Sequence, residues 1–369
     1  MKSSVCAQEK STRYYKGANY SIKHFQSRNS PCGFFYFYLN PHKGFPVYAN
    51  MKKIFVFIIC FTFPLWATAQ KIDNTASFRD IKSSDYFRWH YDNDYFTASD
   101  YYYTQGYNFE LVAKALAKNP INVLLIKPKT SQLKYGLSFE HIGFTPTSIL
   151  SNDILYGDRP FAAAVMLKSF VISTDTLKKT RLSSSLSIGI IGPGAFGRET
   201  QAGIHKWVDD DEPLGWQHQI KNDVLLNYEL AHETQLLKLN EWLALNSDAR
   251  LRLGTVNTNI SGGLNSVFGK INSAFGAVKN EKKFLIYGYA QSRVSLIGYD
   301  ATLQGGIFNR SSPYTIPNSD ISRVTLQHNF GVVMQFKNIY LEYSRSEISR
   351  EFKSGNPHRW GGFRIGFKL

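Results

Sequence analysis

The stretch GFRIGFKL, residues 362–369, decides the fold, because its residues alternate strictly between two kinds. In an extended strand, one side would carry the large apolar side chains of Phe363, Ile365, Phe367 and Leu369. The other side would carry the small or basic residues Gly362, Arg364, Gly366 and Lys368. A period of two with one apolar face indicates a strand that is half buried.

The same alternation recurs through most of the chain. It predicts strands at Phe330 to Phe336, Ile339 to Tyr343 and Ser185 to Ile190. In a fourth stretch we expect two opposite faces, with Tyr103, Tyr107 and Phe109 on one side and Thr104, Gly106 and Asn108 on the other. About twelve strands of roughly ten residues can be placed in this way.

A second start of the chain, at Met51, has the features of an export signal. Lys52 and Lys53 precede a short apolar run at residues 54–63, and Ala67-Thr68-Ala69 is a small-x-small cleavage site. This pattern predicts a signal peptide at residues 51–69, cleaved after Ala69. We expect residues 1–50 to be a spurious or unstructured extension, with a genuine N-terminal tail as the alternative, and residues 70–369 to form one domain.

Cysteine and charge narrow the function of the exported part. All three cysteines, Cys6, Cys32 and Cys60, precede residue 70, which excludes disulfides, thiolate metal sites and a cysteine nucleophile. Nine of the 43 Lys and Arg and one of the 28 Asp and Glu also precede it, so the net charge falls from +15 to +7. No nucleic-acid-binding motif follows, so we expect no nucleic-acid partner.

Three features together predict a transmembrane antiparallel β-barrel, an all-β fold, in the bacterial outer membrane. The chain carries an export signal, its apolar strand faces are rich in aromatic residues, and no apolar run after residue 70 is long enough for a membrane helix. A soluble periplasmic β-sandwich is the alternative, since its strands also alternate.

Two polar stretches suit a site as well as ordinary structure. Asp92-Asn93-Asp94, followed by Asp100, closes the first strand with side chains that are poor strand formers. They are suited to binding a metal through oxygen or to hydrogen bonding at the barrel rim, or they form a simple polar strand end. Thr104 would reach this cluster, or it is an ordinary inward threonine.

Two further stretches lie in predicted loops. Asp158-Arg159 before Pro160 would lock a loop or bind an anionic head group, and locking is favoured. After Gly192-Pro193-Gly194, the sequence predicts a short helix with Glu199 in it and with Gln201 and His205 on one face. A lone histidine is often a bystander, but a loop helix above a barrel has no core to explain it.

Taken in order, these motifs resemble the outer-membrane lipid A 3′-O-deacylase family (LpxR type). The run comprises Asn93-Asp94, Tyr103-Thr104-x-Gly106, Gly157 to Phe161, Gly189 to His205, Gly215 to Ile220 and Tyr299 to Gly305. The resemblance extends from about Phe87 to Leu369. It implies a twelve-stranded barrel with a helix in an extracellular loop, an enzyme acting on lipid A of lipopolysaccharide, and dependence on calcium.

The resemblance also implies roles for single residues. His205 matches the histidine that activates water, Asn93 and Asp94 an Asn-Asp pair, and Thr104 a threonine of the site. Asp94 and Asp92 are the expected metal ligands, while Asp100, Asp158, Arg159, Glu199 and Gln201 are expected to contact substrate or shape the site. We expect the protein to act as a monomer.

One departure concerns the substrate. Between Thr145 and Gly157 the chain has no Lys or Arg to meet a lipid A phosphate, so Lys168, Arg159 or Lys206 would have to substitute. Histidine suits the base of an ester hydrolysis because it titrates near neutral pH.

Two rival functions remain open. One is a phospholipase that uses a Ser-His pair, with Ser99 or Ser151 as the nucleophile. The other is a passive porin or ligand-binding barrel. No G-x-S-x-G motif is present, which argues against a serine hydrolase of that type.

Overall fold

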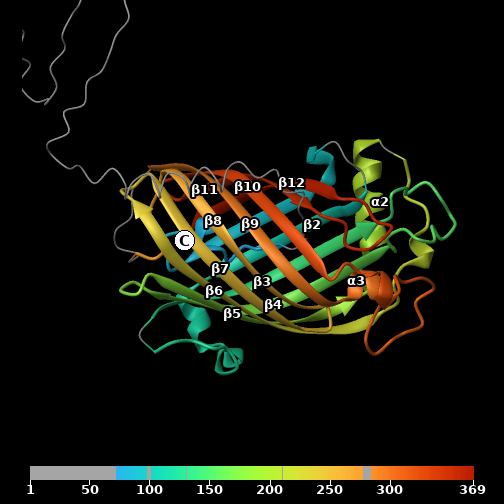
Figure 1. The fold of residues 1–369 in the computed structure, drawn as a ribbon, viewed down its shortest axis with the longest axis horizontal. Coiled ribbons are helices and arrows are strands. Elements are labelled where there is room, and N and C mark those ends of the chain that lie inside the picture. Colours follow the sequence, from blue (N-terminus) through green and yellow to red (C-terminus); the bar gives the residue numbers. More distant parts are fainter. Residues whose placement is uncertain (1–71, 98–100, 130, 210, 277–283) are drawn as a thin grey trace, which may run out of the picture. The chain divides into compact units, whose positions relative to one another are not determined.

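The barrel prediction is confirmed by a computed structural model, which describes residues 72–97, 101–129, 131–209, 211–276 and 284–369. Twelve antiparallel strands in these ranges form one sheet, and β1 closes it by pairing with β12 as well as with β2 (Figure 1). The proposed signal peptide and the extension before it lie outside the described residues. The strands are β1 (Tyr86–Asn93), β2 (Tyr102–Val112), β3 (Gln132–Thr145), β4 (Ala162–Asp175), β5 (Thr180–Ile191), β6 (Asp223–Leu239), β7 (Leu243–Gly254), β8 (Asn257–Lys270), β9 (Phe284–Asp300), β10 (Val324–Phe336), β11 (Ile339–Ile348) and β12 (His358–Lys368).

Short helices occupy the segments between strands. The α-helices are α2 (Gly197–Val208), which confirms the predicted loop helix, and the single turn α3 (Ala301–Gln304). The 3-10 turns are η1 (Ser77–Arg79), η2 (Asp94–Thr97), η3 (Lys114–Lys118), η4 (Pro120–Val123), η5 (Pro193–Ala195), η6 (Trp216–His218) and η7 (Asn318–Asp320). No helix in the described ranges is long and apolar enough to cross a membrane.

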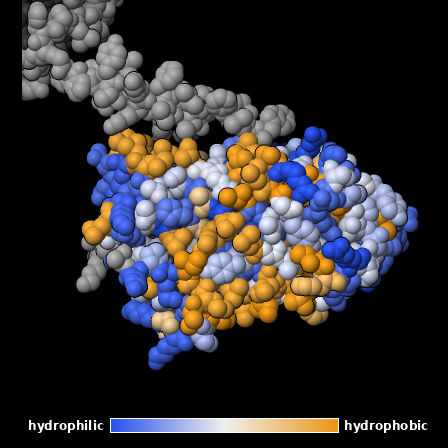
Figure 2. Space-filling view, turned by 60° about the horizontal axis from the view of Figure 1, so that its bottom comes forward, coloured by the Kyte–Doolittle hydropathy of each residue, from blue (hydrophilic) through white to orange (hydrophobic). Residues whose placement is uncertain are grey.

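The two faces of the wall follow the alternation in the sequence. Phe109 is 43% exposed on the outer face, while its neighbour Asn108 is 1% exposed in the lumen. On β12, Phe367 faces out and Arg364 faces in. Apolar side chains gather on the face of the wall seen in Figure 2, and hydrophilic residues gather toward the loops. An apolar outer face is what lipid requires of a closed sheet.

The two ends of the barrel differ in their connections. The C-terminus and the short turns at residues 176–179, 240–242 and 337–338 lie at one end. The opposite end carries α2 and α3 on the two longest connections, residues 192–222 and 301–323 (Figure 1). Because outer-membrane barrels have short periplasmic turns and longer extracellular loops, α2 lies on the extracellular side.

Residues 72–85, which we call the lumen segment, run inside the barrel before β1 begins. The Asp73 carboxylate accepts from Arg250 of β7 at 2.7 Å and from Arg293 of β9 at 3.2 Å. Near the other end of the segment, Asp80 pairs with Lys134 of β3 and Arg181 of β5. The segment therefore connects strands that lie at different positions around the barrel.

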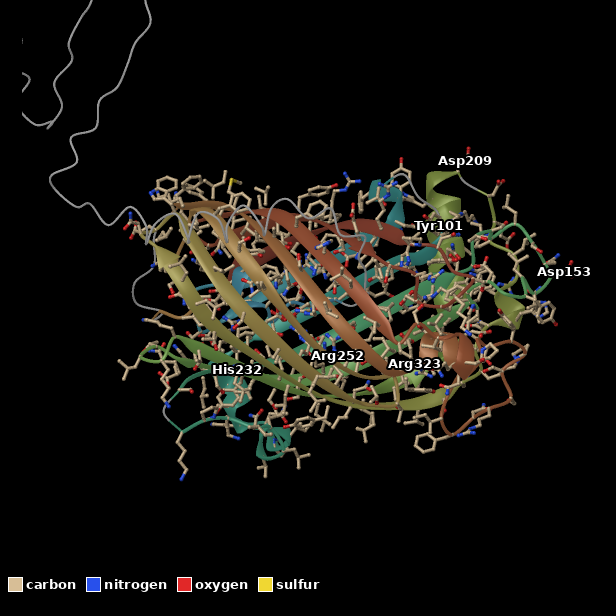
Figure 3. The ribbon with its side chains drawn as sticks, viewed as in Figure 1. Tyr101, Asp153, Asp209, His232, Arg252 and Arg323 are labelled. Carbon is tan, nitrogen blue, oxygen red and sulfur yellow. The ribbon has the colours of Figure 1, made fainter. Side chains whose placement is uncertain are left out.

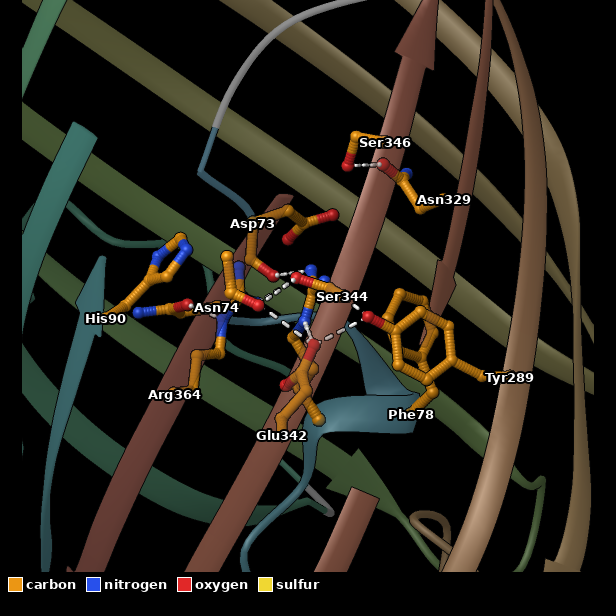
Figure 4. Close-up of polar contacts among 12 residues, drawn as sticks. Asp73, Asn74, Phe78, His90, Tyr289, Asn329, Glu342, Ser344, Ser346 and Arg364 are labelled. Atoms are coloured by element: carbon orange, nitrogen blue, oxygen red, sulfur yellow. Dashed lines mark hydrogen bonds and ion pairs between the residues drawn. The ribbon is translucent and has the colours of Figure 1, made fainter. Parts of the chain in front are cut away.

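A second cluster ties the lumen segment to the C-terminal strands (Figure 4). The Glu342 carboxylate accepts from Arg79 at 2.8 Å, from Tyr289 at 2.6 Å and from Arg364 at 2.9 Å. The Phe78 ring stacks on Tyr289 at 4.2 Å. Buried charges need partners of opposite sign, and here the lumen segment and the wall supply them to each other.

We predict that removing one of these charges destabilises the whole barrel. Asp73→Ala removes a carboxylate that two buried guanidinium groups share. Because Arg250 keeps Glu229 and Arg293 keeps Asp248 as partners, the free energy of unfolding should fall by about 1–3 kcal/mol. Urea-induced unfolding of the detergent-purified protein measures this change.

The control is Lys353→Ala, which breaks an ion pair with Asp320 at the surface. The Lys353 side chain is 67% exposed and the Asp320 side chain 43%. Its effect should stay within about 1 kcal/mol. Equal effects of the two substitutions would contradict a structural role for the lumen segment.

Candidate active site

A β-bulge in β2 sets the direction of the first site residues. Tyr103 pairs with Phe144 and Gln105 pairs with Gly143, so Thr104 is an extra residue between them. Tyr103 turns into the lumen, where its hydroxyl lies over Gly106. A Cβ built on Gly106 would be 1.8 Å from that hydroxyl, so the ring needs a glycine there. The expectation that Tyr103 faces outward and Thr104 inward is therefore wrong, because one extra residue reverses the alternation beyond it.

Thr104 and Gln105 instead lie together on the outer face, over Gly143 of β3. A Cβ on Gly143 would meet Gln105 Cγ at 3.2 Å and Thr104 Cγ2 at 3.4 Å. A larger residue at this position would press on both side chains. The two side chains are nevertheless buried, with exposures of 4% for Thr104 and 1% for Gln105.

Helix α2 covers these side chains from outside. It starts after Phe196, whose φ of 58° turns the chain, and ends before Asp209, whose φ is 59°. A Cβ on Gly197 would lie 2.4 Å from the Ala163 Cβ and 2.6 Å from the Trp216 ring, so glycine permits the helix to approach the wall. Asp209 and Tyr101 lie at this same end of the barrel (Figure 3).

Gln201 links the helix to the wall. Its Nε2 donates to Thr104 Oγ1 at 3.2 Å, and its Oε1 accepts from Trp216 Nε1 at 2.7 Å. The Trp216 donor fixes which end of the amide is oxygen, since an indole N–H only donates. The structure thus brings together two residues that the sequence predicted for one site.

His205 lies one turn further along the same face of α2. Its Nδ1 is 2.6 Å from the carbonyl oxygen of Asp211, and the side chain is 9% exposed. A carbonyl only accepts, so Nδ1 carries the proton and Nε2 carries the lone pair of the neutral ring.

In the acidic stretch at the end of β1, Asp92 and Asn93 face opposite sides of the wall. Asp92 faces the lumen and lies 2.5 Å from His90 Nε2. Because Asp92 pairs with Gly106, the next residues, Asn93 and Gln105, lie side by side on the outer face. The Asp94 carboxylate accepts from the Tyr101 amide at 2.7 Å. Strand alternation thus turns Asp92 inward, away from Asn93 and Gln105, and its role as a metal ligand with Asp94 stays a prediction.

Two site residues were missed by the sequence interpretation. The Nε2 of Gln105 is buried and has no hydrogen-bond partner. On β3, His141 Nε2 lies 2.9 Å from the Ala195 carbonyl under α2, and its ring stacks on Tyr107 at 4.7 Å. Alternation places His141 on the outer face, but only the fold brings the η5 loop over it.

Asp158 and Arg159 brace the loops instead of facing lipid. The Asp158 carboxylate accepts from the Thr147 amide at 2.8 Å. Arg159, 1% exposed, pairs with Glu351, donates to Thr302 at 2.7 Å and lies over the Phe144 ring. This geometry supports the loop-locking alternative. Burial raises the pKa of Glu351 to about 7, although Arg159 opposes the shift.

Comparisons with known proteins identify the family and the fold of this chain. A family model described as "Outer membrane protein LpxR" matches residues 55–369. The chain belongs to the LpxR family. Among solved structures, LpxR from Salmonella typhimurium aligns with a TM-score of 0.64 at 17% identity, over 77% of this chain and 100% of that one. No curated protein sequence matches.

Two autotransporter barrels are also similar. The β domain of the Bordetella autotransporter BrkA aligns with a TM-score of 0.40 at 9% identity, over 78% of this chain and 100% of that one. The translocator domain of NalP from Neisseria meningitidis aligns at 0.41 and 10% identity, over 88% and 96%. Family and fold place the protein in the bacterial outer membrane, and family membership supports an enzyme that modifies lipid A.

The other residues expected from the LpxR resemblance are scattered. Glu199 is exposed on the outward side of α2, in the first turn, where the helix dipole favours an acid. Lys168 points into the lumen and pairs with Glu140 at 3.2 Å, so it does not reach lipid outside. Lys206 is exposed on α2. Asp100 lies outside the described residues.

The end of β1 and the start of β2 carry side-chain oxygens whose chemistry suits a calcium ion. Asp94 offers a carboxylate, Asn93 and Gln105 offer amide oxygens, and Thr104 offers a hydroxyl, all of which calcium accepts. Within the described ranges, no three or more His, Cys, Asp or Glu side chains group into a metal cluster. A calcium ion held here would therefore have Asp94 as its one carboxylate ligand, with neutral oxygens for the rest.

We predict that Gln201 holds α2 against the wall. Gln201→Leu leaves the Trp216 N–H buried without an acceptor, a penalty of about 1–3 kcal/mol. The α2 loop, residues 192–222, should become more sensitive to added protease while the barrel keeps its unfolding temperature.

The control is Glu199→Gln, on the exposed side of the same helix, which should leave the cleavage rate unchanged. If Gln201→Leu also leaves that rate unchanged, the link from helix to wall does not hold the loop.

Proposed function

We propose that the protein hydrolyses the 3′-linked acyloxyacyl ester of lipid A. The main support is that Gln201 of α2 bonds to Thr104 on the outer wall, with His205 one turn further along the same helix face, at the extracellular end where the outer leaflet presents lipid. Family membership supports lipid A as the substrate. The lumen is a less suitable place for the reaction, since the buried lumen segment occupies it.

In the proposed reaction, His205 acts as the general base. Its Nε2 takes a proton from water while the water oxygen bonds to the ester carbonyl carbon. The tetrahedral intermediate then loses the sugar oxygen, which takes up the proton. The products are a free acyloxyacyl fatty acid and lipid A with a 3′ hydroxyl. The Asp211 carbonyl holds the ring in the tautomer that this step requires.

The site also offers groups for the carbonyl oxygen as its negative charge develops. The buried Nε2 of Gln105 has no partner in the protein and can donate to that oxygen. A bound calcium ion would supply Lewis-acid stabilisation to the same oxygen. Thr104, held by Gln201, and Asn93 beside Gln105 then line the position of the ester.

The phosphate of the substrate needs a separate cation. Of the three basic residues expected from the sequence, Arg159 and Lys168 are engaged with Glu351 and Glu140. Lys206 is exposed on α2, so we assign it the contact with a lipid A phosphate.

Two rival functions receive less support from the geometry. For a porin, the lumen segment would have to leave its ion pairs with Arg250, Arg293 and Glu342. For a Ser-His hydrolase, Ser151 would need a histidine, yet its hydroxyl bonds with the backbone of Asp153. Ser99 lies outside the described residues.

We predict that His205→Ala lowers the rate of lipid A deacylation about 10²–10⁴-fold, the usual contribution of a positioned proton acceptor. Mass spectrometry of purified lipid A incubated with the enzyme in detergent measures the product.

His232→Ala, an exposed histidine on β6, is the matched control and should keep the wild-type rate (Figure 3). Near-normal deacylation by a folded His205→Ala barrel would remove His205 from the mechanism. Cleavage of phospholipid but not of lipid A by the wild-type enzyme would refute the substrate instead.

Calcium dependence is the second test of the proposal. A chelator should abolish deacylation, and added calcium should restore it. Asp94→Ala removes the one carboxylate of the proposed set, so binding of Tb³⁺, followed by its luminescence, should weaken in this variant. Full activity in the chelator would rule out a catalytic calcium ion.

A further inference from the structure

An apolar groove crosses the outer wall on β3 to β6, below α2. It has about 750 Å³ of space, part of it open to the surroundings. Its wall is formed by outward apolar side chains, with no polar side chain among its lining residues: Phe139, Val165, Leu167, Ile188, Ile190 and Val224. In the view of Figure 2, this part of the wall is turned forward, and apolar residues gather there.

Strand register places the groove next to the candidate active site. His141 pairs with Val165, Val165 with Ile190, and Ile190 with Val224, so these residues form one outward row. The next outward row toward the extracellular end contains Gly143 and Ala163, and the Gln105 side chain lies over Gly143. Two residues along a strand span about 7 Å, so the groove begins one short step from the proposed ester position.

The upper end of the groove meets the structure that carries α2. A Cβ on Gly194 of η5 would lie 2.8 Å from Ile190 Cδ1, so η5 sits on the groove. Val165 packs against the cluster that contains Ala163, Ala195 and Trp216. The groove therefore shares side chains with the segment that leads into α2.

We infer that this groove binds one acyl chain of the lipid A molecule whose ester lies under α2. The inference rests on the proposed function and extends it to the part of the substrate away from the reacting ester. An acyl chain matches the groove because both are wholly apolar, and lipid A carries several acyl chains beside the scissile bond. The outcome to exclude is a groove that contacts only bulk membrane lipid.

The test fills the groove with a bulky side chain. Val224→Trp places an indole on the row of Ile190 and Val165, and Val224 is 54% exposed on the outer face. The matched control is Val324→Trp, at the extracellular start of β10, where Val324 is 58% exposed and lines no part of the groove. Heat-modifiable mobility in gels verifies that both barrels fold.

We expect Val224→Trp to raise KM for lipid A in mixed micelles about tenfold, as for the loss of about two buried methylene groups. kcat should stay within about twofold, because the chemical groups under α2 are unchanged, and Val324→Trp should match the wild type. Equal KM values for the two variants would overturn the inference and leave bulk lipid as the occupant. If Val224→Trp does not fold, Ile188→Trp on the same groove replaces it, with the same expectation.

Direct binding separates this inference from the proposed function. The Kd for lipid A, measured in the same micelles with His205→Ala barrels, should weaken about tenfold with Val224→Trp and not with Val324→Trp. A wild-type enzyme that binds lipid A with this sensitivity but leaves it intact would refute the deacylase proposal and keep the groove. Cleavage of lipid A by the wild type, with equal Kd values for the two variants, would keep the deacylase proposal and refute the groove.

Discussion

The ion pairs between the lumen segment and the barrel wall determine what fills the interior of the barrel, and with it the side on which a substrate can bind. A sheet that closes in lipid pairs its own backbone groups, but its inward polar side chains still need partners. Asp73 and Arg79 supply them to Arg250, Arg293 and Glu342, and the interior is thereby occupied by protein. Because the interior of the barrel is occupied, we expect a lipid substrate to bind on the outer face, where Thr104 and Gln105 lie.

The bulge at Thr104 connects this wall to the site. One extra residue in β2 turns Tyr103 into the lumen and places Thr104 and Gln105 together on the lipid side. Gln201 then bonds to Thr104, and His205 follows one helical turn later. Bulges often lie beside active sites because they redirect a side chain without breaking the sheet.

The sequence predicted what depends on local pattern and missed what depends on distant contacts. Alternation identified outward Phe109 and inward Arg364, and helical spacing placed Gln201 beside His205. The sequence did not predict the bulge at Thr104, because one extra residue in a strand leaves no distinctive local pattern. Nor did it predict the role of Asp73, whose partners Arg250 and Arg293 follow far along the chain. Local pattern favoured Arg159 as part of a loop lock, but it did not identify the partner Glu351, which follows far along the chain.

In the proposed function, lipid A binds between the outer wall and α2 and not in the lumen. Hydrogen–deuterium exchange of the His205→Ala barrel, with and without lipid A in detergent, tests this location most directly. We predict slower exchange of residues 197–208 and of the extracellular ends of β2 and β3 when lipid A is present, with the lumen segment unchanged. Slower exchange of residues 72–85, with α2 unaffected, would contradict the account.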